Sequence, residues 1–366
     1  MLLVSIVGDF HSSIFPIYNE FKDKIDYHLV VDDDAFNERR KHRKIVASLK
    51  KFNAKYNLKF ITQEFKIDED SLKSIEKLID HIDNLESDPQ KIYINITDGL
   101  ANIGIALAAK LLPKGVKFIS YDMYENSYNI TTYESIKNYK IKESLSIEDH
   151  FLLKGLEVTQ KGNKEFANKY RREILELFNN YSEEMELLNK DITHRSSKNR
   201  AQYPRALQLV KSMGFDIFRD APLITGGLFE YYVYLLIKDM GFDDIEMGVQ
   251  VRQPLSDAVG VENEFDILLM KENHLHMIEC KFRKMKKRDI VYKYASLINL
   301  IDDDSMMMIV TNDDVYSHDI YDAKRIELSD YRRAFLNRIM LRGSVIKNKQ
   351  LFFAEIQTLF LKTNEA

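Results

Sequence analysis

The chain has 366 residues, of which 45% are hydrophobic and 30% are charged, and its formal net charge is -4. This length allows two domains with separate cores. The weak net charge excludes a protein that binds nucleic acid through its overall charge alone, so such binding would need local patches or a metal. The single cysteine, Cys280, excludes an intramolecular disulfide framework and a cysteine zinc cluster, and we therefore predict a cytoplasmic protein.

The apolar segments do not predict export or membrane insertion. Residues 1–8 lack the basic region and the small-residue cleavage site of a signal peptide, so we interpret them as a first strand. The longest later apolar segment, Ile103 to Leu112, contains Lys110 and is too short to span a bilayer. We therefore expect no membrane partner.

Strand and helix patterns alternate over the first third of the chain. The predicted strands are Leu2–Val7, Tyr27–Val31, Phe60–Phe65, Ile92–Ile96 and Lys117–Tyr121. The predicted helices between them are Ile14–Phe21, Ala35–Tyr56, Ser71–Ile82 and Ile103–Leu112. Such alternation implies right-handed βαβ units, with helices on both faces of a mostly parallel sheet. We predict a Rossmann-like domain over residues 1–145, which includes a β-rich segment after residue 124.

Two loops of this domain are candidate ligand sites, because ligands of such sheets bind beyond the carboxyl ends of the strands. The loop after the first strand contributes Gly8, Asp9, Ser12 and Ser13, and the loop after the fourth contributes Thr97, Asp98, Gly99 and Asn102. Hydroxyls and backbone amides near a helix N-terminus suit a phosphate. Neither loop is a dinucleotide or Walker A motif, and helix capping explains the same residue types.

A helical connector is predicted over residues 146–215. Its start, Ser146-Ile-Glu-Asp149, has the pattern of a helix cap, and helical stretches follow at Asn163–Asn180 and Ser182–Leu188. The functional alternative is a winged-helix DNA-binding domain, but no segment reads as a recognition helix.

The last region, residues 216–366, has the order helix, three strands, helix, strand. These elements are Gly226–Met240, Ile245–Val251, Phe265–Met270, His274–Phe282, Asp289–Leu300 and Ser305–Val310. A final segment, Ser329–Leu361, is predicted to be largely helical. We predict a second α/β domain here.

The second and third of these strands form a hairpin that carries charged residues among apolar ones. Side chains alternate along a strand, so Glu279 and Lys281 lie on one face, and Asp266 on the neighbouring strand reaches the same point. Charges in such surroundings require pairing, solvent access or a divalent metal. An ordinary hairpin with a cross-strand salt bridge is the alternative.

The chemistry that best fits this group is metal-dependent hydrolysis of a phosphodiester. Two hard carboxylates suit Mg²⁺ or Mn²⁺. A lysine beside the metal can orient or deprotonate the attacking water. The basic loop that follows, with Arg283, Lys284 and Lys286, would bind a nucleic-acid backbone without reading its sequence, or would be a solvated turn.

The order Asp266…Glu279-Cys280-Lys281 resembles the PD-(D/E)xK nuclease superfamily. The resemblance implies that Asp266 and Glu279 bind the metal, that Cys280 lends its backbone carbonyl to it, and that Lys281 positions water. It also implies an acidic residue on the preceding helix, for which Glu230 is the candidate, and a polar residue on the next helix, for which Lys293 is. A plain surface charge is the alternative for Glu230.

The segment Tyr93-Ile-Asn-Ile-Thr-Asp-Gly99 resembles the N-x-T-G-G-T-K element of CRISPR-associated Rossmann-fold (CARF) sensor domains. Asp98 replaces the first glycine of that element, and Leu100 and Ala101 replace its Thr-Lys. Together with the nuclease-like region, nearly the whole chain resembles the cyclic-oligoadenylate-activated effector nucleases of type III CRISPR antiviral defence.

This resemblance implies a homodimer that binds a cyclic oligoadenylate, most plausibly cyclic tetra-adenylate, and then cleaves RNA, DNA or both with little sequence preference. Two alternatives remain open. One is a ligand-responsive regulator that binds nucleic acid without cleaving it, and the other is a nuclease that needs no activator.

Overall fold

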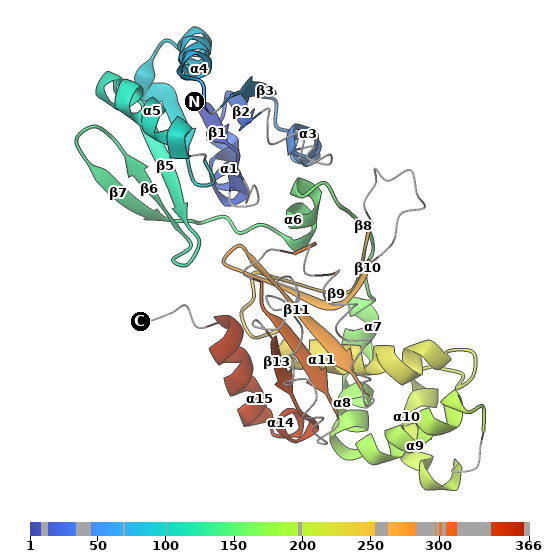
Figure 1. Cartoon of the computed structure of the whole chain (residues 1–366). Helices are drawn as coiled ribbons and strands as arrows, with labels where there is room; N and C mark the ends of the chain where they lie inside the picture. The colour runs from blue at the N-terminus through green and yellow to red at the C-terminus, as the bar shows by residue number, and fades with distance from the viewer. Residues whose placement is uncertain are drawn as a thin grey trace. The chain divides into compact units, whose positions relative to one another are not determined.

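The computed structural model describes residues 1–8, 14–33, 45–68, 70–99, 101–196, 200–252, 263–282, 297, 300–301, 305–312 and 338–361. The chain forms two compact units, residues 1–157 and residues 158–252 together with 261–365. Each unit contains one β-sheet covered by helices (Figure 1). The predicted α/β fold class is confirmed.

The first unit is built on a seven-stranded sheet with the order β3-β2-β1-β4-β5-β6-β7. The strands are β1 Leu2–Ile6, β2 Tyr27–Asp33, β3 Ile61–Ile67, β4 Ile92–Asn95, β5 Lys117–Asp122, β6 Ser127–Thr131 and β7 Ile136–Lys140. β1 to β5 pair in parallel, and β6 and β7 add an antiparallel hairpin at one edge. This is the Rossmann-like sheet that the alternating pattern predicted.

Helices cover both faces of this sheet, because alternate side chains of the central strand β1 point to opposite cores. Leu2, Val4 and Ile6 pack in one core with α4 (Leu72–Leu85) and α5 (Ala101–Leu111). Leu3 and Val7 pack in the other with α1 (Phe15–Phe21) and α3 (Ile45–Lys55). The two faces of one strand therefore hold the unit together.

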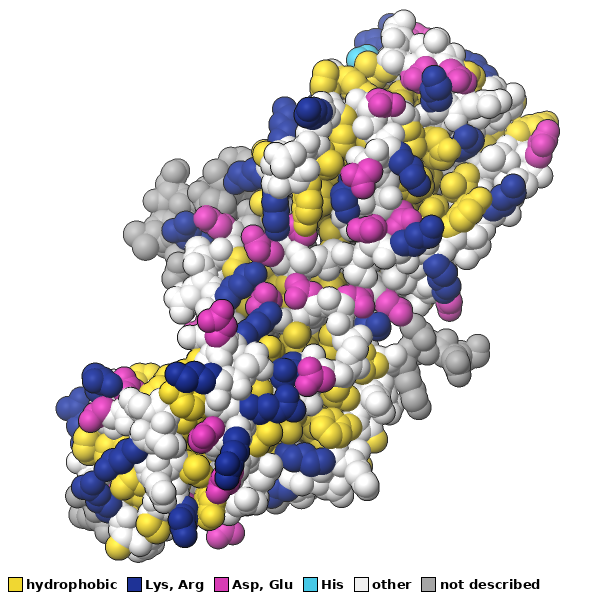
Figure 2. Space-filling model, turned by 180° about the vertical axis from the view of Figure 1, so that it is seen from behind, with side chains coloured by type: hydrophobic (Ala, Val, Ile, Leu, Met, Phe, Trp, Pro, Cys, Tyr) yellow, Lys and Arg dark blue, Asp and Glu magenta, His cyan; other side chains and the backbone are white. Residues whose placement is uncertain are grey.

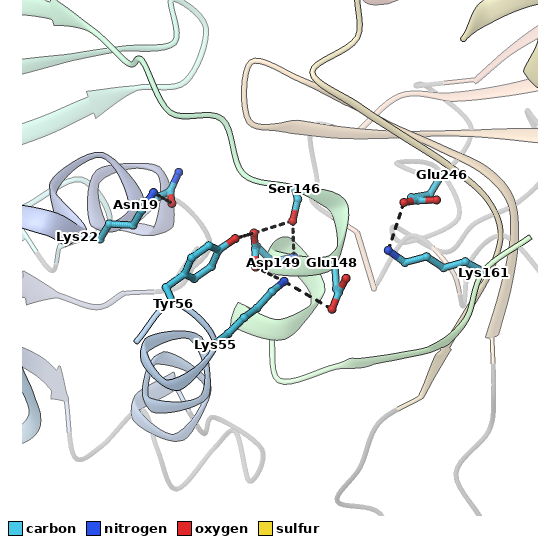
Figure 3. A network of polar contacts seen from close by, with 9 residues as sticks. All are labelled: Asn19, Lys22, Lys55, Tyr56, Ser146, Glu148, Asp149, Lys161 and Glu246. Carbon is cyan, nitrogen blue, oxygen red and sulfur yellow. Dashed lines mark hydrogen bonds and ion pairs between the residues drawn. The ribbon is translucent and has the colours of Figure 1, made fainter. Parts of the chain in front are cut away.

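The helix that ends the first unit, α6 (Ile147–Leu153), is held to α3 by a buried carboxylate (Figure 3). Asp149 accepts hydrogen bonds from Lys55 Nζ at 2.8 Å, Tyr56 OH at 2.5 Å and Ser146 Oγ at 2.6 Å. Ser146 Oγ also accepts the backbone N–H of Asp149 at 3.1 Å, so the predicted helix cap is present. α6 is thereby fixed to the end of α3.

A histidine lies inside the first unit with little to stabilise a positive charge. His28 on β2 is fully buried, and one ring nitrogen lies 2.9 Å from Ser5 Oγ on β1. Burial lowers the pKa of His28 to about 3. The imidazole is therefore neutral in the folded protein at every pH near neutrality.

We predict that acid destabilises the first unit through His28. Below about pH 6.5 the unfolded chain binds a proton there that the folded unit excludes, so the free energy of unfolding falls by up to about 1.4 kcal/mol per pH unit. Urea unfolding between pH 7 and pH 4 measures this dependence. In His28→Gln the slope of the free energy of unfolding against pH should decrease by the contribution of about one proton. His194→Gln, which replaces an exposed histidine, is the control and should keep the wild-type slope. An unchanged slope in His28→Gln would contradict the assignment.

The second unit is built on a six-stranded sheet with the order β13-β12-β11-β10-β9-β8. The strands are β8 Glu157–Gln160, β9 Asp244–Arg252, β10 Asn263–Lys271, β11 His274–Lys281, β12 Met307–Thr311 and β13 Arg338–Leu341. β9, β10 and β11 form an antiparallel meander, and β12 and β13 continue it in parallel. The predicted three strands and the following strand are all present.

The helices of this unit share one large core with the sheet. They are α7 Lys164–Lys169, α8 Arg171–Asn180, α9 Ser182–Thr193, α10 Pro204–Ser212, α11 Leu228–Ile237, α14 Gly343–Lys347 and α15 Lys349–Ile356. Ile278, Cys280, Met308 and Val310 supply the sheet side of that core. Among the described residues, no helix is long and apolar enough to cross a membrane.

The last segment is helical from Gly343 onward, as predicted, but the prediction is wrong for the residues just before it. The sequence predicts helix over 329–361, but Arg338–Leu341 forms β13, which pairs in parallel with β12. A short apolar run reads equally well as helix or strand, and the free edge of β12 decides in favour of the strand. The predicted helix Asp289–Leu300 lies largely outside the described residues.

Candidate active site

The β10–β11 hairpin brings Asp266 and Glu279 to the same end of the sheet. Ile267 lies opposite Ile278, so Asp266 and Glu279 follow directly on either side of that pair. The backbone N–H of Cys280 donates to Asp266 Oδ2 at 2.7 Å. The Asp266 carboxylate is therefore fixed by the strand that carries the other two charged residues.

Lys281 joins the two carboxylates. Its ammonium pairs directly with Glu279 and lies 3.6 Å from Asp266 Oδ2. Glu279 is fully buried, whereas the Lys281 side chain is 33% exposed and reaches solvent. Burial by itself would lower the pKa of Lys281, but the charges of Asp266 and Glu279 outweigh it and raise that pKa above its ordinary value. The structure thus brings these three predicted site residues together, with the lysine protonated.

Glu230 lies in the first turn of α11 and faces the same group of charges. Burial, followed by the negative charges of Asp266 and Glu264, raises the pKa of Glu230 to about 8. At neutral pH this carboxyl therefore holds a proton. The charges of Asp266, Glu264 and Glu279 thus act on Glu230, and its role in the site stays a prediction from the sequence.

The Cys280 side chain points away from these charges. It packs in the core formed with the helices, and burial, followed by the charge of Asp266, raises the pKa of its thiol well above the ordinary value. The thiol is therefore neither a thiolate ligand nor a nucleophile. The backbone N–H of Cys280 contacts Asp266, and the metal-binding role of its carbonyl stays a prediction.

The donor set fits a hard divalent cation. Two carboxylates converge on one ammonium, and Glu230 and Glu264 add further acidic groups close enough to influence one another. In the described ranges, no group of three or more His, Cys, Asp or Glu side chains is placed to hold a metal ion, so protein side chains would supply at most two ligands. Mg²⁺ commonly uses one or two carboxylates and takes its other ligands from water and phosphate.

Three further residues support the Lys281 backbone, and the sequence analysis did not find them. The backbone N–H of Asn312, directly after β12, donates to the Lys281 carbonyl at 3.4 Å, and its side-chain amide donates to Glu186 on α9 at 3.1 Å. Gly343 packs so closely on Asn312 that a Cβ there would lie 2.1 Å from its carbonyl oxygen. Parallel pairing of β11 with β12 creates this support, and no local motif signals it.

The two predicted ligand loops of the first unit meet at the ends of β1 and β4. The backbone N–H of Gly8 donates to Asp98 Oδ2 at 3.0 Å. A Cβ on Gly8 would lie 2.0 Å from the Asp98 carbonyl oxygen, so only glycine allows this approach. The Asp98 carboxylate, which replaces a glycine of the CARF element, therefore ties one loop to the other.

The Thr97 side chain also serves the loop itself. Thr97 Oγ1 donates to Asn95 Oδ1 at 2.5 Å and accepts the backbone N–H of Tyr121 at 2.9 Å. Gly99 closes the turn by donating its N–H to Ile96 O at 3.0 Å, and Asn102 is exposed in the first turn of α5. The Asn102 side chain is therefore exposed. The side chains of Thr97 and Asp98 instead form hydrogen bonds that hold the loop backbone in place.

Several predicted site residues lie outside the described residues. These are Asp9, Ser12, Ser13, Arg283, Lys284, Lys286 and Lys293. Their roles remain predictions from the sequence.

Comparison with known proteins agrees with the site in the second unit. Residues 219–340 match the family model described as "Card1-like, endonuclease domain". The second unit contains a Card1-like endonuclease domain. The match covers α11 and the strands β9 to β12, and thus includes Glu230, Asp266, Glu279 and Lys281. The resemblance to a nuclease that the D…ExK order indicated is confirmed for this region.

Two solved structures share the fold over almost the whole chain. The protein VC1899 from Vibrio cholerae superposes with a TM-score of 0.77 and 16% identity, covering 98% of each chain. Can2 from Sulfobacillus thermosulfidooxidans, solved in complex with cyclic tetra-adenylate, superposes with a TM-score of 0.66 and 13% identity, covering 96% of this chain and 98% of Can2. No curated protein matches the chain at a significant level. The Card1-like endonuclease domain thus follows a Rossmann-like unit in an arrangement of elements that Can2 shares.

We predict that Glu230 makes the stability of the Card1-like endonuclease domain depend on pH in the absence of divalent metal. The folded domain keeps a proton on Glu230 up to about pH 8, whereas the unfolded chain loses it near pH 4.5, so the free energy of unfolding falls as the pH rises between these values. The free energy of unfolding of Glu230→Gln minus that of wild type should therefore be larger at pH 8.5 than at pH 5.

Urea unfolding in the presence of a chelator measures this difference. Glu165→Gln, at an exposed position of α7, is the control. Its difference from wild type in the free energy of unfolding should be the same at both pH values. The same shift at pH 5 and pH 8.5 in Glu230→Gln would show that Glu230 is an ordinary surface carboxylate.

Proposed function

We propose that the chain is a metal-dependent nuclease of type III CRISPR defence whose activity is switched on by cyclic tetra-adenylate. The observation that carries the proposal is the meeting of Asp266, Glu279 and Lys281 on one hairpin inside a Card1-like endonuclease domain. A structural salt bridge alone would not need a second carboxylate and a raised Glu230 pKa beside it.

In the proposed mechanism Asp266, Glu279 and the Cys280 carbonyl hold Mg²⁺ or Mn²⁺. When bound, the metal supplies positive charge to the scissile phosphate and favours ionisation of a water. Because the pKa of Lys281 is raised, its ammonium stays protonated and acts as a hydrogen-bond donor. Lys281 therefore orients the attacking water and offsets the charge that develops on the phosphate, and it does not act as the base.

Glu230 is the group suited to move a proton. Its pKa of about 8 lies near the working pH, where proton transfer is most effective. A cation bound at Asp266 and Glu279 would favour the ionised form of Glu230. Glu230 would then accept a proton from the water that Lys281 orients.

The first unit is the proposed activator site. Its two loops are joined by the hydrogen bond from Gly8 to Asp98 at the carboxyl ends of β1 and β4, where ligands of such sheets bind. Can2, which shares this fold, was solved with cyclic tetra-adenylate. We propose the same ligand here, bound by a homodimer, and RNA or DNA as the substrate with little sequence preference.

Cleavage assays test this proposal. Labelled single-stranded RNA, single-stranded DNA and supercoiled plasmid are incubated with Mn²⁺ or Mg²⁺, with and without cyclic tetra-adenylate. We expect cleavage only when both metal and ring are present, and a loss of at least about 100-fold in Lys281→Ala, because a charged donor to the transition state is removed. Lys271→Ala is the matched control, since Lys271 lies at the other end of the same hairpin and pairs with Asp243.

The outcomes separate the alternatives. Ring binding without any cleavage would favour a regulator that only binds nucleic acid. Cleavage without the ring would favour a nuclease that needs no activator. Equal activity in Lys281→Ala and Lys271→Ala would remove Lys281 from the mechanism.

A further inference from the structure

The turn between α9 and α10 belongs to a segment with no acidic residue. From Ile192 to Phe215 the chain has 24 residues, of which five are Lys or Arg and none is Asp or Glu. The five are Arg195, Lys198, Arg200, Arg205 and Lys211. In a chain whose net charge is -4, this is a strong local excess of positive charge. Figure 2 shows Lys and Arg side chains recurring over the lower part of the second unit.

The turn is anchored from inside by one carboxylate. Asp191, at the end of α9, is buried and accepts hydrogen bonds from Tyr203 OH at 2.9 Å and Ser196 Oγ at 2.8 Å. Its backbone carbonyl accepts the N–H of Ser196 at 2.8 Å. Asp191 thus fixes both ends of the turn and holds its own charge inward, away from the surface.

Three arginines lie on this turn or in the first turn of α10, and their side chains are exposed. Arg195, Arg200 and Arg205 are all exposed, and in the described part of the chain none of the three guanidinium groups pairs with a carboxylate. Glu184 accepts the backbone N–H groups of Arg205 and Ala206 and so caps α10. The Arg205 guanidinium donates to Gln208 Oε1 at 3.3 Å, a neutral partner that leaves its charge in place. Exposed guanidinium groups that pair with no carboxylate are well suited to phosphate oxygens.

The same helix connects this turn to the active site. Glu186, early in α9, accepts a hydrogen bond from Asn312, whose backbone N–H in turn contacts the carbonyl of Lys281. From Glu186 to the end of α9 at Thr193 the helix rises by about 10 Å. In a duplex each strand advances about 3.4 Å per nucleotide. A strand bound at Lys281 therefore needs only a few nucleotides beyond the cleavage point to cover the length of this part of α9.

We propose that Arg195, Arg200 and Arg205 form a second contact surface for the substrate, which binds the phosphate backbone of the RNA or DNA strand that is cut at Lys281. The proposed contact is to phosphate oxygens, which carry no sequence information. This inference rests on the proposed nuclease function.

The test compares two triple variants of equal charge. In the first, Arg195, Arg200 and Arg205 are replaced by Gln. In the control, Lys114, Lys140 and Arg171 are replaced by Gln; these are exposed cations that already pair with Asp83, Glu125 and Asp239. Circular dichroism melting checks that both variants fold.

Binding of a fluorescent 20-nucleotide strand is measured across a salt series, and cleavage of the same strand is measured as KM and kcat. Loss of three phosphate contacts should reduce the slope of log K against log salt by about 2 for a single strand, and should raise KM with kcat little changed. With progressively shorter strands, the arginine variant and the control should converge once the strand no longer spans the distance from Lys281 to the turn.

The result that overturns this inference is equal salt dependence and equal KM in the two triple variants. Its failure is distinguishable from failure of the proposed function, because wild-type cleavage reports on the nuclease and only the difference between the two triple variants reports on the arginines.

Discussion

The candidate site depends on one electrostatic arrangement, the ammonium of Lys281 held between the carboxylates of Asp266 and Glu279. Burying a carboxylate is costly unless it is paired, and Glu279 is fully buried. The ammonium offsets part of this cost, and the Cys280 N–H offsets more by donating to Asp266. Burial, followed by the negative charges of Asp266 and Glu264, raises the pKa of Glu230 beside them. We propose that a divalent cation completes this site.

Sheet topology makes this arrangement possible. β10 and β11 form the hairpin that carries the charges, while β12 pairs with β11 in parallel and brings Asn312 to the Lys281 backbone. α11 adds Glu230, and α9, which precedes the matched endonuclease region, adds Glu186. The second unit therefore gathers the candidate site and its support from two helices and three strands.

Local patterns predicted most strands, most helices and the three charged residues, because alternation along a hairpin depends only on neighbours in sequence. They missed β8, which lies inside the predicted helical connector. They could not place Asn312 or Glu186, because both positions depend on contacts between residues far apart in the sequence. They also assigned β13 to a helix, because its short apolar run becomes a strand only by pairing with β12, which the sequence does not show. The roles of Thr97 and Asp98 illustrate the same limit. Both were predicted as ligand contacts from residue type, and the structure shows that their side chains also bind the loop together.

The measurement that tests the central claim most directly is calorimetric titration of Mn²⁺ into the protein without nucleic acid, for wild type, Asp266→Asn and Glu279→Gln. The account predicts that wild type binds the ion and that each variant binds at least about tenfold more weakly, because each loses one of two charged ligands. Melting curves of the metal-free proteins control for folding. Unchanged Mn²⁺ affinity in both folded variants would contradict the account and leave the hairpin as a structural salt bridge.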